Sequence, residues 1–330
     1  MARLVVCGAI NWDISCFVEH LPSPGEEVTI KRITRVSGGT GANVAVAAAR
    51  ILGHDQVALI AALGEDETAY RQTSALEAEG VITAGIKLLA EEESGQAYIL
   101  IDKAGQNVIA SHLGANARLF SKYLDKQSVE WLLQGCQGIV LTDPPLDTTA
   151  ELLNLAKDRG IPTLWDPGIL TSHSWKILEP LAREADVIFL NEAEAAALLG
   201  TAEPQQSLQY LQRQGFRKHI VLKLGARGAA MLEPATGTVL QVPSLPLKDL
   251  GLDIVSSVGC GDVFAGVFAA YYVLEADIRK SLIMASTAAG LNATNPETRG
   301  GPDRATLEAM EKRSRALGFT AQERKLPKSR

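Results

Sequence analysis

Cysteine, aromatic residues and clustered histidines are all scarce in this chain of 330 residues. Its four cysteines lie far apart, and its five histidines show no spacing that would gather metal ligands. A disulfide framework and a zinc site of the usual kinds are therefore excluded, and we expect a reduced, cytoplasmic setting. The cysteines are Cys7, Cys16, Cys136 and Cys260.

A surplus of basic residues is also missing. Lysine and arginine number 32 against 38 acidic residues, so the formal net charge is −6. This balance argues against nucleic acid or an anionic membrane as a partner. No apolar run is long enough to span a bilayer, and no charged segment followed by a long apolar run suggests a signal peptide.

Short apolar runs alternate with helical patterns along most of the chain. Strand-like runs occur at 4–7, 57–61, 139–141, 163–165, 187–190 and 220–222. Helix-like segments lie between them at 43–52, 66–79, 127–134, 147–158, 192–199 and 205–214. This alternation predicts an α/β fold, a single domain over 1–330 in which helices cover both faces of a mostly parallel sheet.

Two regions interrupt this alternation. Residues 14–37 and 95–113 consist of extended, alternating segments, which predicts a small separate β-sheet, or lid, over the substrate site. Because its apolar residues exceed what one small ligand could cover, we expect two chains to pair through the lid as a homodimer. Residues 318–330 are expected to be a frayed end.

The most informative segment runs from Val255 to Phe268. Gly259 and Gly261 flank Cys260, Asp262 follows, and an apolar helical run continues. Unpaired N–H groups at a helix N-terminus bind phosphate well, and a carboxylate beside them suits a general base. The alternative is a glycine-rich turn in which Asp262 only caps a helix.

A second glycine cluster precedes another helix. Gly38, Gly39, Thr40 and Gly41 lead into Asn43, which lies in the first turn. An amide both donates and accepts hydrogen bonds, so it suits hydroxyl groups better than a free phosphate. The alternative is that these small residues only let the helix lie close to a sheet.

These two segments and five others together resemble the ribokinase-like, or PfkB, carbohydrate kinases. The other stretches are 5–13, 191–194, 224–228 and the short triplets at 64–66 and 114–116. The matches occur in the family's order over residues 3–300. The resemblance implies the ribokinase-like fold and ATP-dependent phosphorylation of a primary hydroxyl of a sugar, as in a ribokinase or fructokinase.

The resemblance also implies roles for individual residues. Asp262 would deprotonate the acceptor hydroxyl, and the N–H groups of Gly259, Cys260 and Gly261 would form an anion hole. Six residues would form the sugar pocket: Asn11, Asp13, Gly39, Thr40, Asn43 and Asp143. Four would bind ATP: Asn191, Lys223, Gly225 and Gly228. Asn191 and Glu194 would organise Mg²⁺, through water.

Several of these residues have simpler explanations. Asn191 and Glu194 could only start a helix, Gly225 and Gly228 could form a hairpin turn, and Asp13 could be a turn residue. Cys260 stands where the family usually has alanine, which suggests a tolerated small residue rather than a nucleophile.

The chain departs from the family pattern near both ligands. Ser256 replaces an aspartate that helps hold a monovalent cation in potassium-activated members, so cation activation is in doubt. Thr40 replaces a lysine common in ribokinases, and Asp143 is shorter than their glutamate. The alternatives are therefore a nucleoside kinase of the same fold and a non-catalytic sugar-binding regulatory protein.

Overall fold

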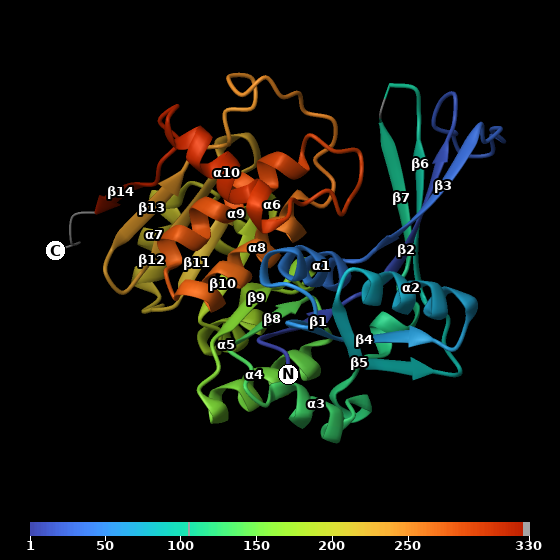
Figure 1. Ribbon diagram of the computed structural model, residues 1–330, viewed down its shortest axis with the longest axis horizontal. Coiled ribbons are helices and arrows are strands. Elements are labelled where there is room, and N and C mark those ends of the chain that lie inside the picture. Colours follow the sequence, from blue (N-terminus) through green and yellow to red (C-terminus); the bar gives the residue numbers. More distant parts are fainter. Residues whose placement is uncertain (105, 326–330) are drawn as a thin grey trace.

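The computed structural model describes residues 1–104 and 106–325, and its main element is a ten-stranded sheet (Figure 1). The strand order is β14-β13-β12-β11-β10-β9-β8-β1-β4-β5. The seven strands from β11 to β5 run parallel, and β12, β13 and β14 extend the sheet antiparallel. The strand bounds are β1 Leu4–Gly8, β4 Val57–Gly64, β5 Val81–Leu89, β8 Gly138–Thr142, β9 Thr163–Asp166, β10 Val187–Asn191, β11 His219–Lys223, β12 Ala229–Glu233, β13 Thr238–Val242 and β14 Gln322–Lys325.

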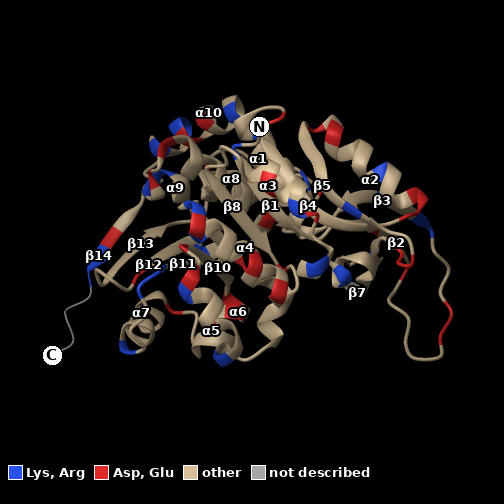
Figure 2. Ribbon diagram, turned by 90° about the horizontal axis from the view of Figure 1, so that it is seen from below, with Lys and Arg blue, Asp and Glu red and all other residues tan. Residues whose placement is uncertain are grey.

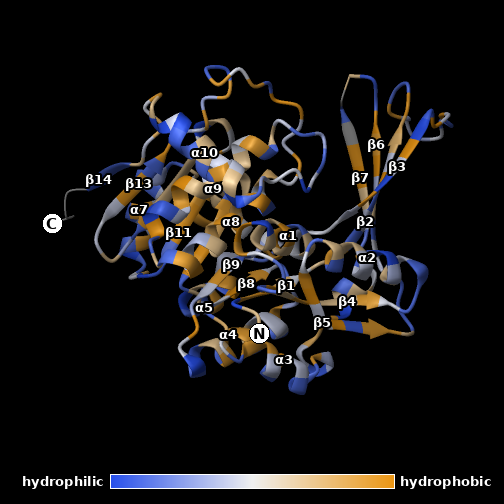
Figure 3. Cartoon of the chain, in the orientation of Figure 1, coloured by the Kyte–Doolittle hydropathy of each residue, from blue (hydrophilic) through white to orange (hydrophobic). Residues whose placement is uncertain are grey.

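Helices cover both faces of this sheet, as the alternation predicted. On β1, Leu4 and Val6 point to a core shared with α1, α8 and α9, whereas Val5 and Cys7 point to a core shared with α3 to α7. Strands buried on both sides are almost wholly apolar, and β4 is accordingly orange in Figure 3. The helix bounds are α1 Thr40–Leu52, α2 Glu67–Ala78, α3 Lys126–Leu133, α4 Leu146–Arg159, α5 Trp175–Glu184, α6 Glu192–Leu199, α7 Pro204–Arg213, α8 Cys260–Glu275, α9 Ile278–Asn292 and α10 Arg304–Arg315.

A second, four-stranded sheet stands apart from the first at the right of Figure 1. Its order is β3-β2-β6-β7, with β2 Asn11–Phe17, β3 Arg32–Gly38, β6 Gly95–Ile101 and β7 Asn107–His112. These strands match the two extended regions from which the lid was predicted. Residue 105, between β6 and β7, lies outside the described residues.

The prediction of a frayed end is wrong as far as residue 325. Phe319 is buried, and β14 pairs with β13. The side chains of β14 are all exposed, so its sequence lacks the alternation that would have indicated a strand. Residues 326–330 of the predicted end lie outside the described part of the chain.

Charged residues of both signs are mixed along surface helices such as α2 and α10 (Figure 2). In the described residues, no helix is long and apolar enough to cross a membrane.

Candidate active site

Helix α8 brings the candidate base into the centre of the molecule. Gly259 precedes it with φ 76°, and a Cβ there would lie 2.0 Å from the Thr298 carbonyl oxygen, so only glycine fits. At Gly266 a Cβ would lie 2.5 Å from the Val44 carbonyl oxygen. The absence of that Cβ lets α8 approach α1 closely, and this contact puts Asn43 beside Asp262.

Asn43 and Asp262 are joined by a direct hydrogen bond. Asn43 Nδ2 donates to Asp262 Oδ2 over 2.8 Å, across 219 positions of sequence. Burial raises the pKa of Asp262 to about 6, although the Asn43 bond and the nearby Lys223 ammonium lower it. A carboxylate in this range is ionised at neutral pH and can accept a proton from a hydroxyl.

The predicted anion hole lies at the N-terminus of α8, where Gly261 leaves open space. A Cβ built on Gly261 would meet only Lys223 Nζ, at 3.6 Å. No neighbour therefore requires glycine in this first helical turn, where alanine would favour the helix by roughly 1 kcal/mol. The missing side chain leaves room for a group that approaches the helix N-terminus.

Asn11 and Asp13 lie on β2, where the lid joins the main sheet. Asn116 Nδ2 donates to Asn11 Oδ1 over 3.0 Å, so the Asn11 amide nitrogen is left as a donor. Asp13 is 9% exposed, and it lies against Gly38, where a Cβ would be 2.0 Å from Oδ2. Burial raises the pKa of Asp13 to about 6, with Arg299 lowering it and Asp262 raising it. Asp13 is a strand residue and not the turn residue of the alternative prediction.

Thr40 and Asp143 form a second polar group next to Asp262. Thr40 Oγ1 donates to Asp143 Oδ1 over 3.2 Å, and Thr142 Oγ1 donates to Thr40 Oγ1 over 3.0 Å. Asp143 has φ 46°, a left-handed conformation that is rare outside glycine. Burial, then the nearby Asp166, raises the pKa of Asp143 to about 8.

The predicted nucleotide side is built mostly from contacts between residues close in sequence. Asn191 Oδ1 accepts from the Glu194 N–H over 2.9 Å, and Glu194 Oε2 accepts from the Asn191 N–H over 2.8 Å. This capping box starts α6, as the structural alternative predicted. Gly225 and Gly228 likewise form the turn between antiparallel β11 and β12. Lys223, at the end of β11, forms an ion pair with Asp166.

One cavity of about 1000 Å³ connects most of these groups. Apolar residues of α9 and of the segment before α8 line its far part, including Leu245, Leu247 and Ala289. Asn11, Asp13, Gly39, Asn43 and Gly259 are not part of the lining; they lie beside or behind Asp262. The predicted residues that line it are Thr40, Asp143, Asn191, Glu194, Lys223, Gly225, Gly228, Cys260, Gly261 and Asp262.

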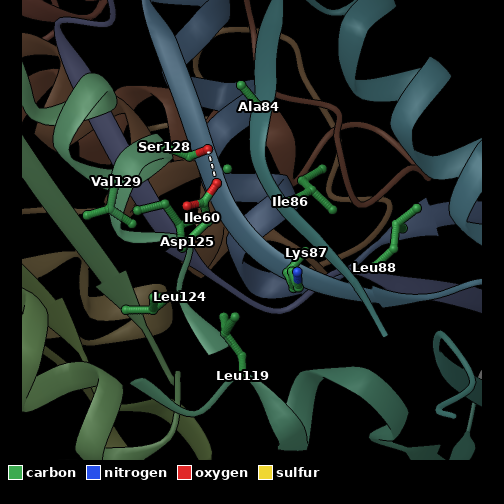
Figure 4. A pocket seen from close by; sticks show the side chains of 11 residues that line it. Ile60, Ala84, Ile86, Lys87, Leu88, Leu119, Leu124, Asp125, Ser128 and Val129 are labelled. Atoms are coloured by element: carbon green, nitrogen blue, oxygen red, sulfur yellow. Dashed lines mark hydrogen bonds between the residues drawn. The ribbon is translucent and has the colours of Figure 1, made fainter. Parts of the chain in front are cut away.

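A smaller hollow of about 260 Å³ lies between β5 and α3 (Figure 4). It holds none of the predicted site residues. Its Asp125 carboxylate accepts from Ser128 Oγ over 2.7 Å and caps α3, which is a structural role.

Oxygen ligands for a divalent cation are present but sparse. In the described part of the chain, no three His, Cys, Asp or Glu side chains gather as a metal-ligand group. Glu194 and Asp166 nevertheless face the same cavity, and each carboxylate raises the pKa of its neighbours here. Such a donor set fits Mg²⁺, which keeps several waters and takes further oxygens from phosphates.

Comparison with known proteins agrees with this geometry. Residues 1–304 match the pfkB family of carbohydrate kinases. The chain belongs to this family. It is thus an ATP-dependent carbohydrate kinase, and its fold is the ribokinase-like fold that the sequence predicted.

Three relatives illustrate the similarity. The kinase is 27% identical to an ATP-dependent ribose-1-phosphate kinase of Halopiger xanaduensis, over 92% of this chain and 95% of that one. It is 27% identical to a ribokinase of Haemophilus influenzae, over 93% and 98% of the two chains. The structure of Arabidopsis thaliana ribokinase complexed with ribose and ATP aligns with a TM-score of 0.84 at 26% identity, covering 94% of this chain and 99% of that chain.

Sequence reasoning missed one charged residue at the site. Arg299 Nε donates to Asn43 Oδ1 over 2.9 Å. It lies in the irregular segment between α9 and α10, where no periodic pattern marks it. The only sequence signal available was a lone arginine before a Gly-Gly pair, which does not indicate a function.

Proposed function

We propose that this kinase phosphorylates the primary hydroxyl of a pentose or pentose 1-phosphate, with Asp262 as the general base. The observation that carries the proposal is the Asn43–Asp262 hydrogen bond, because it fixes the half-buried carboxylate at the N-terminus of α8. On one side of that carboxylate lies the open helix N-terminus, and on the other lie the polar side chains of the lid strand. Two of the relatives named above are a ribose-1-phosphate kinase and a ribokinase, which supports a pentose or its 1-phosphate as the acceptor.

In the proposed step Asp262 takes the proton of the acceptor hydroxyl. That oxygen forms a bond to the γ-phosphorus of ATP, and the bond to the β–γ bridging oxygen breaks, so ADP leaves with the electron pair. The N–H groups of Gly259, Cys260 and Gly261 face the charge that develops on the phosphoryl group. Asn11 and Asp13 hold sugar hydroxyls, with Gly39, Thr40, Asn43 and Asp143 around them.

On the donor side, Lys223, Gly225 and Gly228 contact the nucleotide phosphates in this proposal. Asn191, Glu194 and Asp166 would hold Mg²⁺ through its waters, and the ion would neutralise phosphate charge. Lys223 is protonated at neutral pH, because the neighbouring Asp166 and Glu194 raise its pKa against the effect of burial.

The test is an ADP-release assay with ATP and Mg²⁺ on ribose, 2-deoxyribose, ribose 1-phosphate, fructose and adenosine. We expect turnover of a pentose or its 1-phosphate, and a fall in kcat of roughly 10² to 10⁴-fold in Asp262→Asn. Asp303→Asn, which removes the charge of the α10 N-cap but keeps an oxygen that can accept from the Thr306 N–H, is the matched control. Turnover of adenosine alone would establish the nucleoside kinase alternative, and no turnover of any acceptor would favour a sugar-binding regulatory protein.

We also propose a homodimer that forms through the lid. Asp13 marks the sheet face toward the site, and the register places Ile33, Leu100 and Val108 in one row on the opposite face. Ile33 and Val108 are 43% and 55% exposed. A second lid would cover this apolar row, so light scattering should report twice the 35.2 kDa chain mass.

A further inference from the structure

One arginine links three elements around the candidate base. Arg299 Nε donates to Asn43 Oδ1 over 2.9 Å, and Arg299 Nη2 donates to the Gly38 carbonyl over 3.3 Å. Gly38 ends the lid strand β3, and Asn43 lies in the first turn of α1. The guanidinium therefore spans the junction where the lid meets the helix that contacts Asp262.

The segment that carries Arg299 is itself fixed to α1. Arg50 Nη1 donates to the carbonyl oxygens of Arg299 and Gly301 over 2.5 and 2.8 Å. Arg50 is in turn held by an ion pair to Glu79, with 2.6 Å between Nη2 and Oε1. Arg299 lies between α9 and α10, where no helix or strand fixes the backbone. The hydrogen bonds from Arg50 hold this backbone and so give Arg299 a defined position.

The hydrogen bonds dictate which way the Asn43 amide faces. A guanidinium can only donate, so the atom of Asn43 that it contacts must be the oxygen. The amide nitrogen then points to Asp262 Oδ2, at 2.8 Å. With Oδ2 engaged in this way, Oδ1 of the same carboxylate is left for the acceptor hydroxyl.

We infer that Arg299 is a positioning residue for phosphoryl transfer: through Asn43 it fixes the orientation of the Asp262 carboxylate, and through Gly38 it couples that orientation to the lid. The inference rests on the proposed role of Asp262 as base. Arg299 itself touches neither the acceptor nor the nucleotide in this account.

The charge of Arg299 gives the inference an observable consequence. Its guanidinium lowers the pKa of both Asp262 and Asp13, against the effect of burial. Removal of the guanidinium should therefore raise the pKa of both carboxylates. The acid limb of the profile, in which kcat/KM rises with pH, should then move to higher pH. Several other charged or titratable groups face this cluster and stay in place: Lys223 from β11, Asp166 from β9, Asp143 from β8, Glu79 after α2, Arg50 from α1 and Cys260 from α8.

The first experiment measures the pH profiles of kcat and kcat/KM for Arg299→Met and Arg299→Lys. We expect kcat of the Met variant to fall roughly 10- to 100-fold, with the KM for ATP unchanged and the acid limb moved to higher pH. The Lys variant keeps the charge and should restore the acid limb, while the changed donor geometry still lowers kcat. The matched control is Arg304→Met, at an exposed arginine that pairs with Glu308 on the same helix.

The second experiment is a double-mutant cycle of Arg299→Met with Asn43→Ala. If Arg299 acts through Asn43, adding Arg299→Met to the Asn43→Ala variant should lower kcat by less than about threefold. Full additivity of the two losses would overturn the inference, as would an acid limb of Arg299→Met at the wild-type position. If the Met variant does not fold, the Lys variant and its cycle with Asn43→Ala decide the same question.

Failure of the inference is distinguishable from failure of the proposed function. If Asp262→Asn is active, Asp262 is not the base, and Arg299 cannot act by positioning it. If Asp262→Asn is inactive but the acid limb of Arg299→Met stays at the wild-type position, the two roles separate. Asp262 then remains the base, and Arg299 has only a structural role.

Discussion

The two halves of the candidate site are held together in different ways. The acceptor half, made of Asn11, Asp13, Asn43, Asp262 and Arg299, depends on side chains that contact one another across the fold. Its two central hydrogen bonds join residues 219 and 256 positions apart. The proposed donor half, made of Asn191, Glu194, Lys223, Gly225 and Gly228, uses a capping box and a hairpin turn whose bonds span three or four positions, with a longer contact in the Lys223–Asp166 ion pair.

The two halves therefore depend on different parts of the fold. The proposed donor half needs β10–α6 and β11–β12, whose contacts are local, and Asp166 at the end of β9, which pairs with Lys223. The acceptor half needs α1, α8, the lid and the segment before α10 to be assembled together. Substrate discrimination and chemistry should therefore be more sensitive to substitution on the acceptor side than nucleotide binding is on the donor side.

The largest effect on ligand affinity should come from Asp13→Ala. Two charge-assisted hydrogen bonds of about 1.5–3 kcal/mol each would be lost, so affinity for the sugar should fall by more than roughly 100-fold. Affinity for ATP should stay within about twofold, because Asp13 is not part of the cavity lining. Calorimetry with each ligand measures both, and unchanged sugar affinity would move the acceptor pocket away from β2.

A smaller effect is expected on the donor side from Glu194→Gln. One carboxylate oxygen is already used by the Asn191 N–H, and the amide can retain that bond. The loss of charge should raise the Mg²⁺ concentration needed for half-maximal activity by roughly tenfold, equivalent to about 1.4 kcal/mol. Glu192→Gln, whose carboxylate pairs with Arg227, is the control. An unchanged Mg²⁺ dependence would remove Glu194 from the ion site.

The main features of the fold were predictable from the sequence because its signals are local. Runs such as Val187–Leu190 are apolar throughout, as buried parallel strands must be. The strands β5, β12 and β13 were not predicted: β12 begins with two alanines, and β5, at the edge of the sheet, has one buried residue followed by half-buried and exposed ones in no regular alternation. Position in the sheet, rather than strand propensity, determines these segments.

The candidate site was predictable where its residues lie close together in the sequence. Gly259, Gly261 and Asp262 stand within four positions and mark one helix start. Arg299 has no such context, because its partners Asn43 and Gly38 are brought to it only by the folded chain. The sequence could not reveal that link, since it depends on how α1 and α10 are placed.

Asp143 should affect stability more than its neighbours do, and in a pH-dependent way. Its folded pKa, about 8, exceeds the ordinary value of 3.8, so its contribution to stability is complete below pH ~4 and is lost as pH rises through ~8. Asp143→Asn has no charge to bury and should melt higher than wild type at pH 9, by roughly 2–4 °C for each kcal/mol gained. At pH 5 the two melting temperatures should be close. An equal difference at both pH values would contradict the raised pKa.

The smallest effect is expected from potassium. Ser256 carries no charge, and the Val258 carbonyl already accepts from Asn292 Nδ2 over 3.0 Å. Replacing potassium by a bulky organic cation should change kcat by less than about twofold. Strong activation would instead place an ion near Asn292 Oδ1, a buried acceptor without a hydrogen-bond partner in the described residues.

The most direct test of the proposed chemistry is a crystal structure with ribose and a non-hydrolysable ATP analogue bound together. We expect the primary hydroxyl oxygen within about 2.6–3.2 Å of Asp262 Oδ1 and in line with the γ-phosphorus. We also expect Asn43 Nδ2 to keep its hydrogen bond to Asp262 Oδ2. A sugar bound with that hydroxyl on Asp143, and with Asp262 out of reach, would contradict the assignment of the base.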